Sequence, residues 1–197
     1  MLVANTMSGS SSETSYLASV QGQLWRWDLK ALVGGVLFGV LMTVLAQIME
    51  RLDTALTGGA FVILGAINFY TIAALSTLLF RLPGGLITGL TNALIAVASG
   101  TSPMATWFVP TNALFAVVYA IVIWRMRMDR LQHYLIAAIV GVWLSMLVIM
   151  WGLLVTIKLP MNVALTSYVV TSIAGTVGAT VLTMLIAKAV DRSRVLQ

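Results

Sequence analysis

Arg81-Leu82-Pro83-Gly84-Gly85 interrupts the longest apolar stretch of the chain, which runs from Thr57 to Gly100. About twenty apolar residues cross a bilayer as a helix, so a run of about forty residues is too long for one ordinary span. Pro83 has no N–H to donate and favours the first turn of a helix. Arg81 places a charge at the junction, where we expect it to reach the lipid headgroups. The stretch therefore predicts a tight turn between two membrane-spanning helices.

The composition of the whole chain is typical of a membrane protein. Of its 197 residues, 60% are hydrophobic and only 9% are charged, and the mean hydropathy is +1.01. A soluble domain usually carries about 25% charged residues. Cysteine is absent, which excludes disulfides and cysteine-based metal sites. We therefore expect an all-α, multi-pass protein of the cell membrane.

Further breaks divide the chain into six predicted spans. They cover residues 29–49, 58–80, 83–99, 104–124, 131–157 and 162–190. The charged stretch Glu50-Arg51-Leu52-Asp53 is interpreted as a short loop after the first span. Residues 1–23 are polar and serine-rich, which is typical of a flexible tail. Residues 192–197 form a basic C-terminal tail, so the predicted six-helix membrane domain covers residues 24–191.

The distribution of basic residues predicts the orientation in the membrane. Six spans place both termini on one side, and nine of the eleven Lys and Arg residues then fall on that side: Arg26, Lys30, Arg81, Arg125, Arg127, Arg130, Lys188, Arg192 and Arg194. Arg51 and Lys158 fall on the other side. Cytoplasmic loops carry the excess of Lys and Arg, so we expect both termini in the cytoplasm. Topology thus accounts for the net charge of +5, and we expect no nucleic-acid partner.

The residue types that catalysis requires are not gathered in this sequence. No Asp, Glu or Lys lies deep within a predicted span, and the lone histidine, His133, sits beside a basic loop. Asp53 and Asp129 fall in loops on opposite sides, and no Walker A lysine or HExxH motif occurs. We therefore expect no catalytic residues, no metal and no cofactor, with any energy supplied by a partner.

Neutral polar and aromatic side chains gather toward the outer halves of the predicted spans. Such side chains are typical of a pocket for a small, largely neutral, heterocyclic solute. The predicted substrate-binding residues are Asn68, Asn92, Trp107, Asn112, Trp151, Asn162, Thr166 and Tyr168. The alternative is that these Asn and Thr residues form hydrogen bonds between helices.

Ala31, Gly35 and Gly39 lie four residues apart in the first span, which places them on one helix face. Small residues at this spacing let another helix approach closely. Two interpretations remain open at this point. The stripe packs inside the protein itself, or it docks a separate membrane subunit.

The chain resembles the substrate-binding S components of energy-coupling-factor vitamin transporters in its six predicted spans, its lack of an ATPase motif and the small-residue stripe of its first span. The general resemblance covers about residues 29–190. The segment from Arg81 to Gly89, with Ser99-Gly100-Thr101-Ser102-Pro103, is similar to the branch that takes up thiamine or its hydroxymethylpyrimidine precursor. The resemblance implies a membrane T subunit docked on the Ala31, Gly35 and Gly39 stripe, a pair of cytoplasmic ATPases, and toppling of the whole S component in the lipid bilayer to deliver substrate.

One departure from the thiamine branch concerns the ligand charge. That branch typically has an acidic residue in its pocket, whereas the third span here offers Thr91 and Asn92. Amides do not neutralise a cation, which favours a neutral substrate.

Two other functions remain alternatives. An accessory or scaffold subunit predicts the same stripe without a ligand, and a small channel needs a polar stripe through both halves of several spans.

Overall fold

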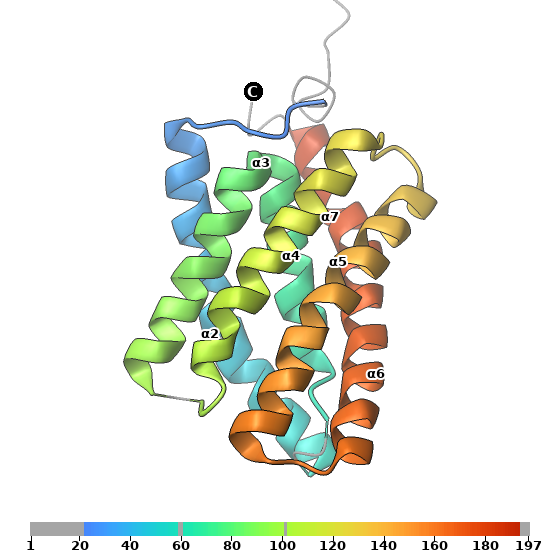
Figure 1. Cartoon of the computed structure of the whole chain (residues 1–197). Helices are drawn as coiled ribbons and strands as arrows, with labels where there is room; N and C mark the ends of the chain where they lie inside the picture. The colour runs from blue at the N-terminus through green and yellow to red at the C-terminus, as the bar shows by residue number, and fades with distance from the viewer. Residues whose placement is uncertain (1–21, 59–60, 101, 194–197) are drawn as a thin grey trace, which may run out of the picture.

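The computed structural model describes residues 22–58, 61–100 and 102–193, and these residues form helices without any strand. The elements are α2 (Leu29–Thr57), α3 (Leu64–Ser99), α4 (Ala105–Arg125), α5 (Leu131–Gly152), η1 (Leu153–Ile157), α6 (Met161–Val177), η2 (Gly178–Leu182) and α7 (Thr183–Ser193). The π-helical turn η1 extends α5, and η2 joins α6 to α7 (Figure 1). Within the described ranges, five continuous helical segments are long and apolar enough to cross a membrane. The all-α prediction is confirmed for these residues; most of the predicted tails, 1–23 and 192–197, lies outside them.

α3 folds back on itself at Arg81, whose φ of 62° and ψ of −165° are not helical. The Oγ of Ser76 lies 2.6 Å from the Oγ1 of Thr88, whereas twelve residues of straight helix span about 18 Å. Residues 64–80 and 82–99 are therefore two antiparallel arms, here called the α3 hairpin (Figure 1). The Arg81–Gly85 stretch forms the turn that the sequence predicts.

Two glycines let the arms of the α3 hairpin close tightly. A Cβ on Gly84 would collide with the Cβ of Phe80, and a Cβ on Gly85 would collide with the Oγ1 of Thr77. Arg81 itself is buried, with 3% of its surface exposed. The expectation that Arg81 reaches the headgroups is therefore wrong. The segment before α2 crosses this end of the bundle, and the N–H of Leu82 donates to the carbonyl of Leu24 at 3.2 Å (Figure 1).

α2 continues to Thr57, which corrects the prediction of a loop at residues 50–53. Asp53 explains the extra turns, because its Oδ1 accepts the N–H of Leu64 and its Oδ2 accepts the N–H of Gly65, both at 2.8 Å. A carboxylate at a helix N-terminus accepts hydrogen bonds from the free N–H groups there, and its negative charge interacts favourably with the helix dipole. Gly58 follows α2 as its C-terminal cap, and its φ of 65° is a left-handed conformation that suits glycine.

The small-residue stripe of α2 is buried against the second arm of the α3 hairpin. Ala31 is 1% exposed. A Cβ on Gly35 would lie 2.8 Å from the Cβ of Ile87, and a Cβ on Gly39 would lie 2.6 Å from the Cβ of Thr91. The stripe therefore packs inside the protein, which corrects the expectation that these three residues dock a separate subunit. The opposite face of α2 is exposed and apolar, at Leu32, Val36, Leu37, Val40, Leu41 and Val44.

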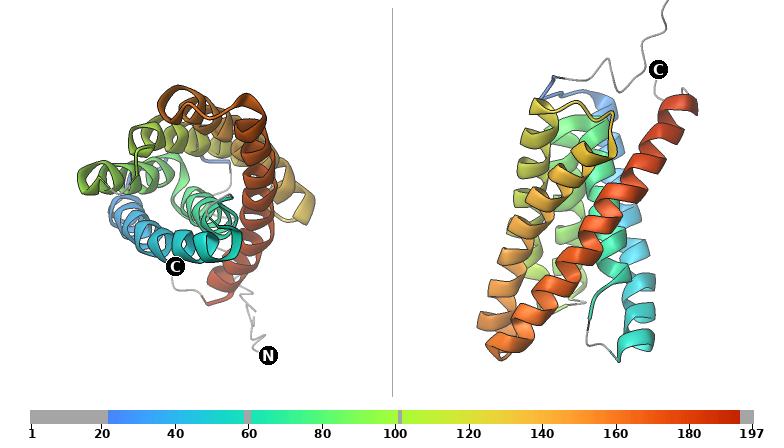
Figure 2. Two further views of the ribbon diagram at one scale, coloured as in Figure 1. Left: turned by 90° about the horizontal axis from the view of Figure 1, so that it is seen from below. Right: turned by 90° about the vertical axis from the view of Figure 1, so that its right-hand side faces the viewer.

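The first arm of the α3 hairpin forms the centre of the bundle. Every residue from Tyr70 to Arg81 is buried, and the other helices surround this arm (Figure 2, left). The start of α2 and the end of α7 lie at one end of the bundle, together with the turn of the hairpin (Figure 1). The end of α2, the start of α4 and η1 lie at the opposite end, and this end carries the pocket described next.

Candidate solute-binding pocket

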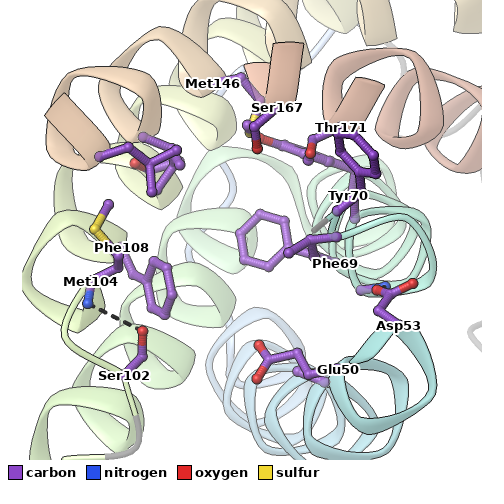
Figure 3. Close-up of a pocket in the computed structure, with 18 of the residues that line it drawn as sticks. Glu50, Asp53, Phe69, Tyr70, Ser102, Met104, Phe108, Met146, Ser167 and Thr171 are labelled. Carbon is purple, nitrogen blue, oxygen red and sulfur yellow. Dashed lines mark hydrogen bonds between the residues drawn. The ribbon is translucent and has the colours of Figure 1, made fainter. Parts of the chain in front are cut away.

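A cavity of about 370 Å³ opens at the bundle end opposite the turn of the α3 hairpin. This volume lies within the range of about 300–1,000 Å³ that is usual for small-molecule pockets. The lining comes from α2, both arms of the hairpin, α4, α5, η1 and α6 (Figure 3). Its polar and aromatic members are Glu50, Asp53, Thr54, Phe61, Phe69, Tyr70, Asn92, Ser102, Phe108, Thr111, Asn112, Ser167 and Thr171.

Asn92 and Asn112 are the two predicted substrate-binding residues that the structure brings together in this wall. Both side chains are buried, at 6% and 2% exposed. The Nδ2 of Asn112 donates to the carbonyl of Gly89 at 2.7 Å and to the Oδ1 of Asn92 at 3.3 Å. The Nδ2 of Asn92 donates in turn to the Oγ1 of Thr43 at 3.0 Å. These bonds connect α2, the second arm of the α3 hairpin and α4 through one polar chain.

Two further predicted residues form hydrogen bonds between helical segments and do not line the cavity. The Nε1 of Trp107 donates to the Oγ1 of Thr156 at 2.8 Å. The hydroxyl of Tyr168 donates to the carbonyl of Trp143 at 3.3 Å. Their polar atoms therefore stabilise helix packing.

The other four predicted residues also lie outside the cavity wall. Trp151 is 59% exposed, and Asn162 and Thr166 are exposed near the start of α6. Asn68 is half-buried on the first arm of the α3 hairpin. These four residues were predicted from their depth along the helices. They lie outside the pocket because the rotation of each helix about its axis determines which side chains face the interior.

Two carboxylates in the wall, Glu50 and Asp53, were predicted to lie in a loop. Asp53 is 3% exposed and each of its oxygens accepts a backbone N–H from the start of α3. The backbone carbonyl of Glu50 accepts a hydrogen bond from the Oγ1 of Thr54, but its carboxylate has no hydrogen bond or ion pair within the described part of the chain. Its carboxylate is directed into the space between Phe69 and Phe108 (Figure 3). Asp53 is thus a structural cap, whereas Glu50 is available to a ligand.

The sequence carried a signal for these two carboxylates. The small-residue stripe of α2 continues at spacings of three and four residues through Met42, Ala46, Glu50 and Asp53. Residues at this spacing share one helix face. Extending the face beyond residue 49, the predicted end of the first span, would have placed both carboxylates toward the bundle interior.

Aromatic side chains form much of the remaining wall. Phe69 and Tyr70 meet edge to face with ring centroids 4.9 Å apart, and Tyr70 also packs on Phe115 at 5.0 Å. The hydroxyl of Tyr70 lies 3.0 Å from the Oγ of Ser145, which holds the Tyr70 ring in place. Fixed aromatic faces beside amides and a carboxylate suit a flat, polar-edged ring. Within the described ranges, no three His, Asp or Glu side chains are placed to hold a metal.

Comparisons of the chain with protein-family models, with curated proteins and with solved structures find no match. The inference of function therefore depends on the pocket, the charge distribution and the sequence resemblance described above.

Proposed function

We propose that this protein is the substrate-binding S component of an energy-coupling-factor importer, and that it captures a small vitamin or heterocyclic precursor from outside the cell. The pocket at the bundle end opposite the hairpin turn is the observation on which the proposal depends. Its volume suits one small solute, and its wall combines aromatic rings, two amides and a free carboxylate. Capture needs these binding groups and no catalytic group, so we propose no enzymatic activity.

In this proposal the protein crosses the cell membrane six times. The two arms of the α3 hairpin have 17 and 18 residues by their bounds, 64–80 and 82–99, and are therefore roughly 25–27 Å long. This length approaches the hydrocarbon thickness of about 30 Å, so each arm counts as one span.

The charges of the two bundle ends support cytoplasmic termini. Eight of the basic residues belong to the end with the start of α2: Arg26, Lys30, Arg81, Arg125, Arg127, Arg130, Lys188 and Arg192. Arg51 and Lys158 belong to the end with the pocket. The positive-inside rule favours the end rich in Lys and Arg as the cytoplasmic one. The pocket then faces outward.

The ligand class follows from the chemistry of the pocket wall. Phe69 and Phe108 offer apolar ring faces, and Asn112 offers a polar edge. Glu50 adds a negative charge that the sequence interpretation did not place in the pocket, so the earlier preference for a neutral solute no longer holds. A thiamine-like or hydroxymethylpyrimidine-like compound combines a flat ring with amino groups, and thiamine adds a positive centre that would suit Glu50.

Delivery to the cytoplasm is assigned to partners, namely a membrane T subunit and a cytoplasmic ATPase pair. The buried stripe of Ala31, Gly35 and Gly39 supports the hairpin. We therefore place the contact with the T subunit on side chains other than these three.

A thermal-shift screen of the detergent-purified protein tests this function. The panel contains thiamine, hydroxymethylpyrimidine and other vitamins. A ligand present at 100 times its dissociation constant adds about 2.7 kcal/mol to the free energy of unfolding. A clear rise in the midpoint with one compound supports the proposal and identifies the substrate class. No shift with any compound, for protein shown to be folded, contradicts it and favours the accessory-subunit alternative.

A further inference from the structure

The charged side chains around the cavity have one sign. Glu50 and Asp53 both line it, and no Lys, Arg or His side chain does so among the residues that the structure describes. Arg51 and Lys158 belong to the same bundle end, but both are exposed and lie outside this wall. The side chains of the wall therefore offer no positive charge to a bound anion.

The backbone does not replace the missing cations, because the helix ends beside the cavity are already capped. A helix N-terminus is a favourable anion-binding site, since its first N–H groups are free. At the start of α3, Asp53 accepts the N–H groups of Leu64 and Gly65, both at 2.8 Å. At the start of α4, the Oγ of Ser102 accepts the N–H of Met104 at 3.1 Å (Figure 3). The protein's own side chains thus use N–H groups that a phosphate would need.

Glu50 adds a repulsive group to this wall. Its side chain is exposed, and its carboxylate is directed into the space between Phe69 and Phe108 (Figure 3). The faces of aromatic rings carry the negative part of the ring quadrupole, so they do not attract an anion either. A phosphate monoester carries close to two negative charges at neutral pH. Such a group would meet a like charge at Glu50 without any compensating cation in the wall.

We infer that the cavity rejects solutes that carry a phosphate or another anionic group, and that the protein captures its substrate in the unphosphorylated form. The inference rests on the proposed function and narrows its substrate class to neutral and cationic solutes. Asp53 shares its charge with two backbone N–H groups, whereas the carboxylate of Glu50 has no partner in the described chain. Glu50 is therefore the residue that determines this selectivity.

The test compares three ligands that differ in one group. The first is hydroxymethylpyrimidine, the second is its phosphate monoester, and the third carries a neutral methanesulfonamide, which has the tetrahedral shape of the phosphate without its charge. Isothermal titration of the detergent-purified full chain at neutral pH measures the three affinities, with and without Mg²⁺. We expect the phosphate to bind at least about tenfold more weakly than the alcohol, because like charges disfavour binding. The sulfonamide should stay within about threefold of the alcohol, since a cavity of about 370 Å³ has room for it.

Two variants assign the selectivity to Glu50. Glu50→Gln removes the charge with little change in shape, and the ratio of the alcohol and phosphate affinities should fall by at least about threefold, because the repulsive group is lost. Glu50→Lys places a cation in the wall and should lower the ratio further, since lysine binds phosphate. Arg51→Gln is the control, because it removes one charge from the neighbouring position on α2, outside the wall, and should not lower the ratio.

The results separate the two proposals. A phosphate that binds the natural protein as tightly as the alcohol, with or without Mg²⁺, overturns the selectivity and leaves solute binding intact. A sulfonamide that binds as weakly as the phosphate assigns the rejection to size and also overturns it. An unchanged ratio in both Glu50 variants overturns the role of Glu50. If hydroxymethylpyrimidine does not bind folded protein, the selectivity inference fails, whereas the proposed function fails only if the wider vitamin panel also gives no binding.

Discussion

Glu50 and Asp53 lie three residues apart on α2, yet their surroundings give them different roles. Asp53 is buried, and its two carboxylate oxygens accept the N–H groups of Leu64 and Gly65. Glu50 reaches the cavity without a partner in the described chain. Substitution of each carboxylate by its amide therefore separates binding from stability at closely matched positions.

Glu50→Gln is expected to weaken the binding of a cationic solute and to leave folding unchanged. A hydrogen bond to a charged group contributes about 1.5–3 kcal/mol, so the affinity for thiamine should fall by roughly tenfold or more. The affinity for neutral hydroxymethylpyrimidine should change much less, because no charge pair is lost. Isothermal titration with both compounds gives the comparison. An equal loss for both would show that Glu50 is not a counter-ion.

Asp53→Asn is expected to lower stability even without ligand. The amide has one acceptor oxygen for two backbone N–H groups, and loss of such a cap costs about 0.5–2 kcal/mol. Thermal unfolding in detergent, with Glu50→Gln as the matched control, measures the difference. A midpoint equal to that of the natural protein would contradict the capping role.

At the same scale, the sequence predicted only part of the pocket. Asn92 and Asn112 were identified because amides within apolar helices are conspicuous. Asn162 carries the same amide group and Trp151 was predicted for its aromatic ring, but both side chains are exposed. The depth of a residue along a helix does not say which way its side chain points, because that direction depends on the rotation of the helix about its axis. The position of Glu50 and Asp53 beside the cavity depended on how far α2 extends, and a cap formed with α3 determines that length.

At the scale of elements, small residues let α2 pack closely on the second arm of the α3 hairpin. Gly35 faces Ile87 and the carbonyl of Gly84, which lies 3.0 Å from a Cβ placed on Gly35. The hydroxyl of Thr88 donates to the carbonyl of Gly35 at 3.0 Å. Both small residues and interhelical hydrogen bonds stabilise helix pairs in membranes.

Gly35→Leu is therefore expected to destabilise the isolated protein. Forcing a large side chain into a packed contact typically costs about 1–3 kcal/mol. Val36→Leu is the control, since Val36 is 40% exposed on the opposite side of α2. Thermal unfolding of both variants without any partner gives the test. Normal stability of Gly35→Leu would indicate that the stripe does not pack as described.

The α3 hairpin was predictable because its turn is encoded locally, by Arg81-Leu82-Pro83-Gly84-Gly85. The bounds of α4 and of the joined α5 and η1 also follow closely from apolar length and flanking basic residues. The burial of Arg81 was not predictable, because the segment before α2 crosses the turn and is distant in sequence. Local chemistry thus defined the turn, whereas its exposure depended on tertiary contacts.

At the scale of the whole molecule, we propose that the two bundle ends lie on opposite sides of the membrane. The chain has no cysteine, so single introduced cysteines report their own location. Asn162→Cys, near the pocket end, is expected to react with a membrane-impermeant maleimide in intact cells. Arg127→Cys, between α4 and α5, should react only after the membrane is permeabilised. The reverse pattern would place the pocket on the cytoplasmic side.

The central claim is that one small solute binds in the pocket and enters it from the side opposite the termini. Protein reconstituted in one orientation in vesicles, with the pocket outward, allows both parts to be measured by equilibrium binding of a radiolabelled ligand identified by the thermal-shift screen. We predict close to one solute bound per chain when the solute is outside, with weaker binding in Asn112→Leu. Binding that requires access from the terminal side, or none in folded protein, would contradict the account.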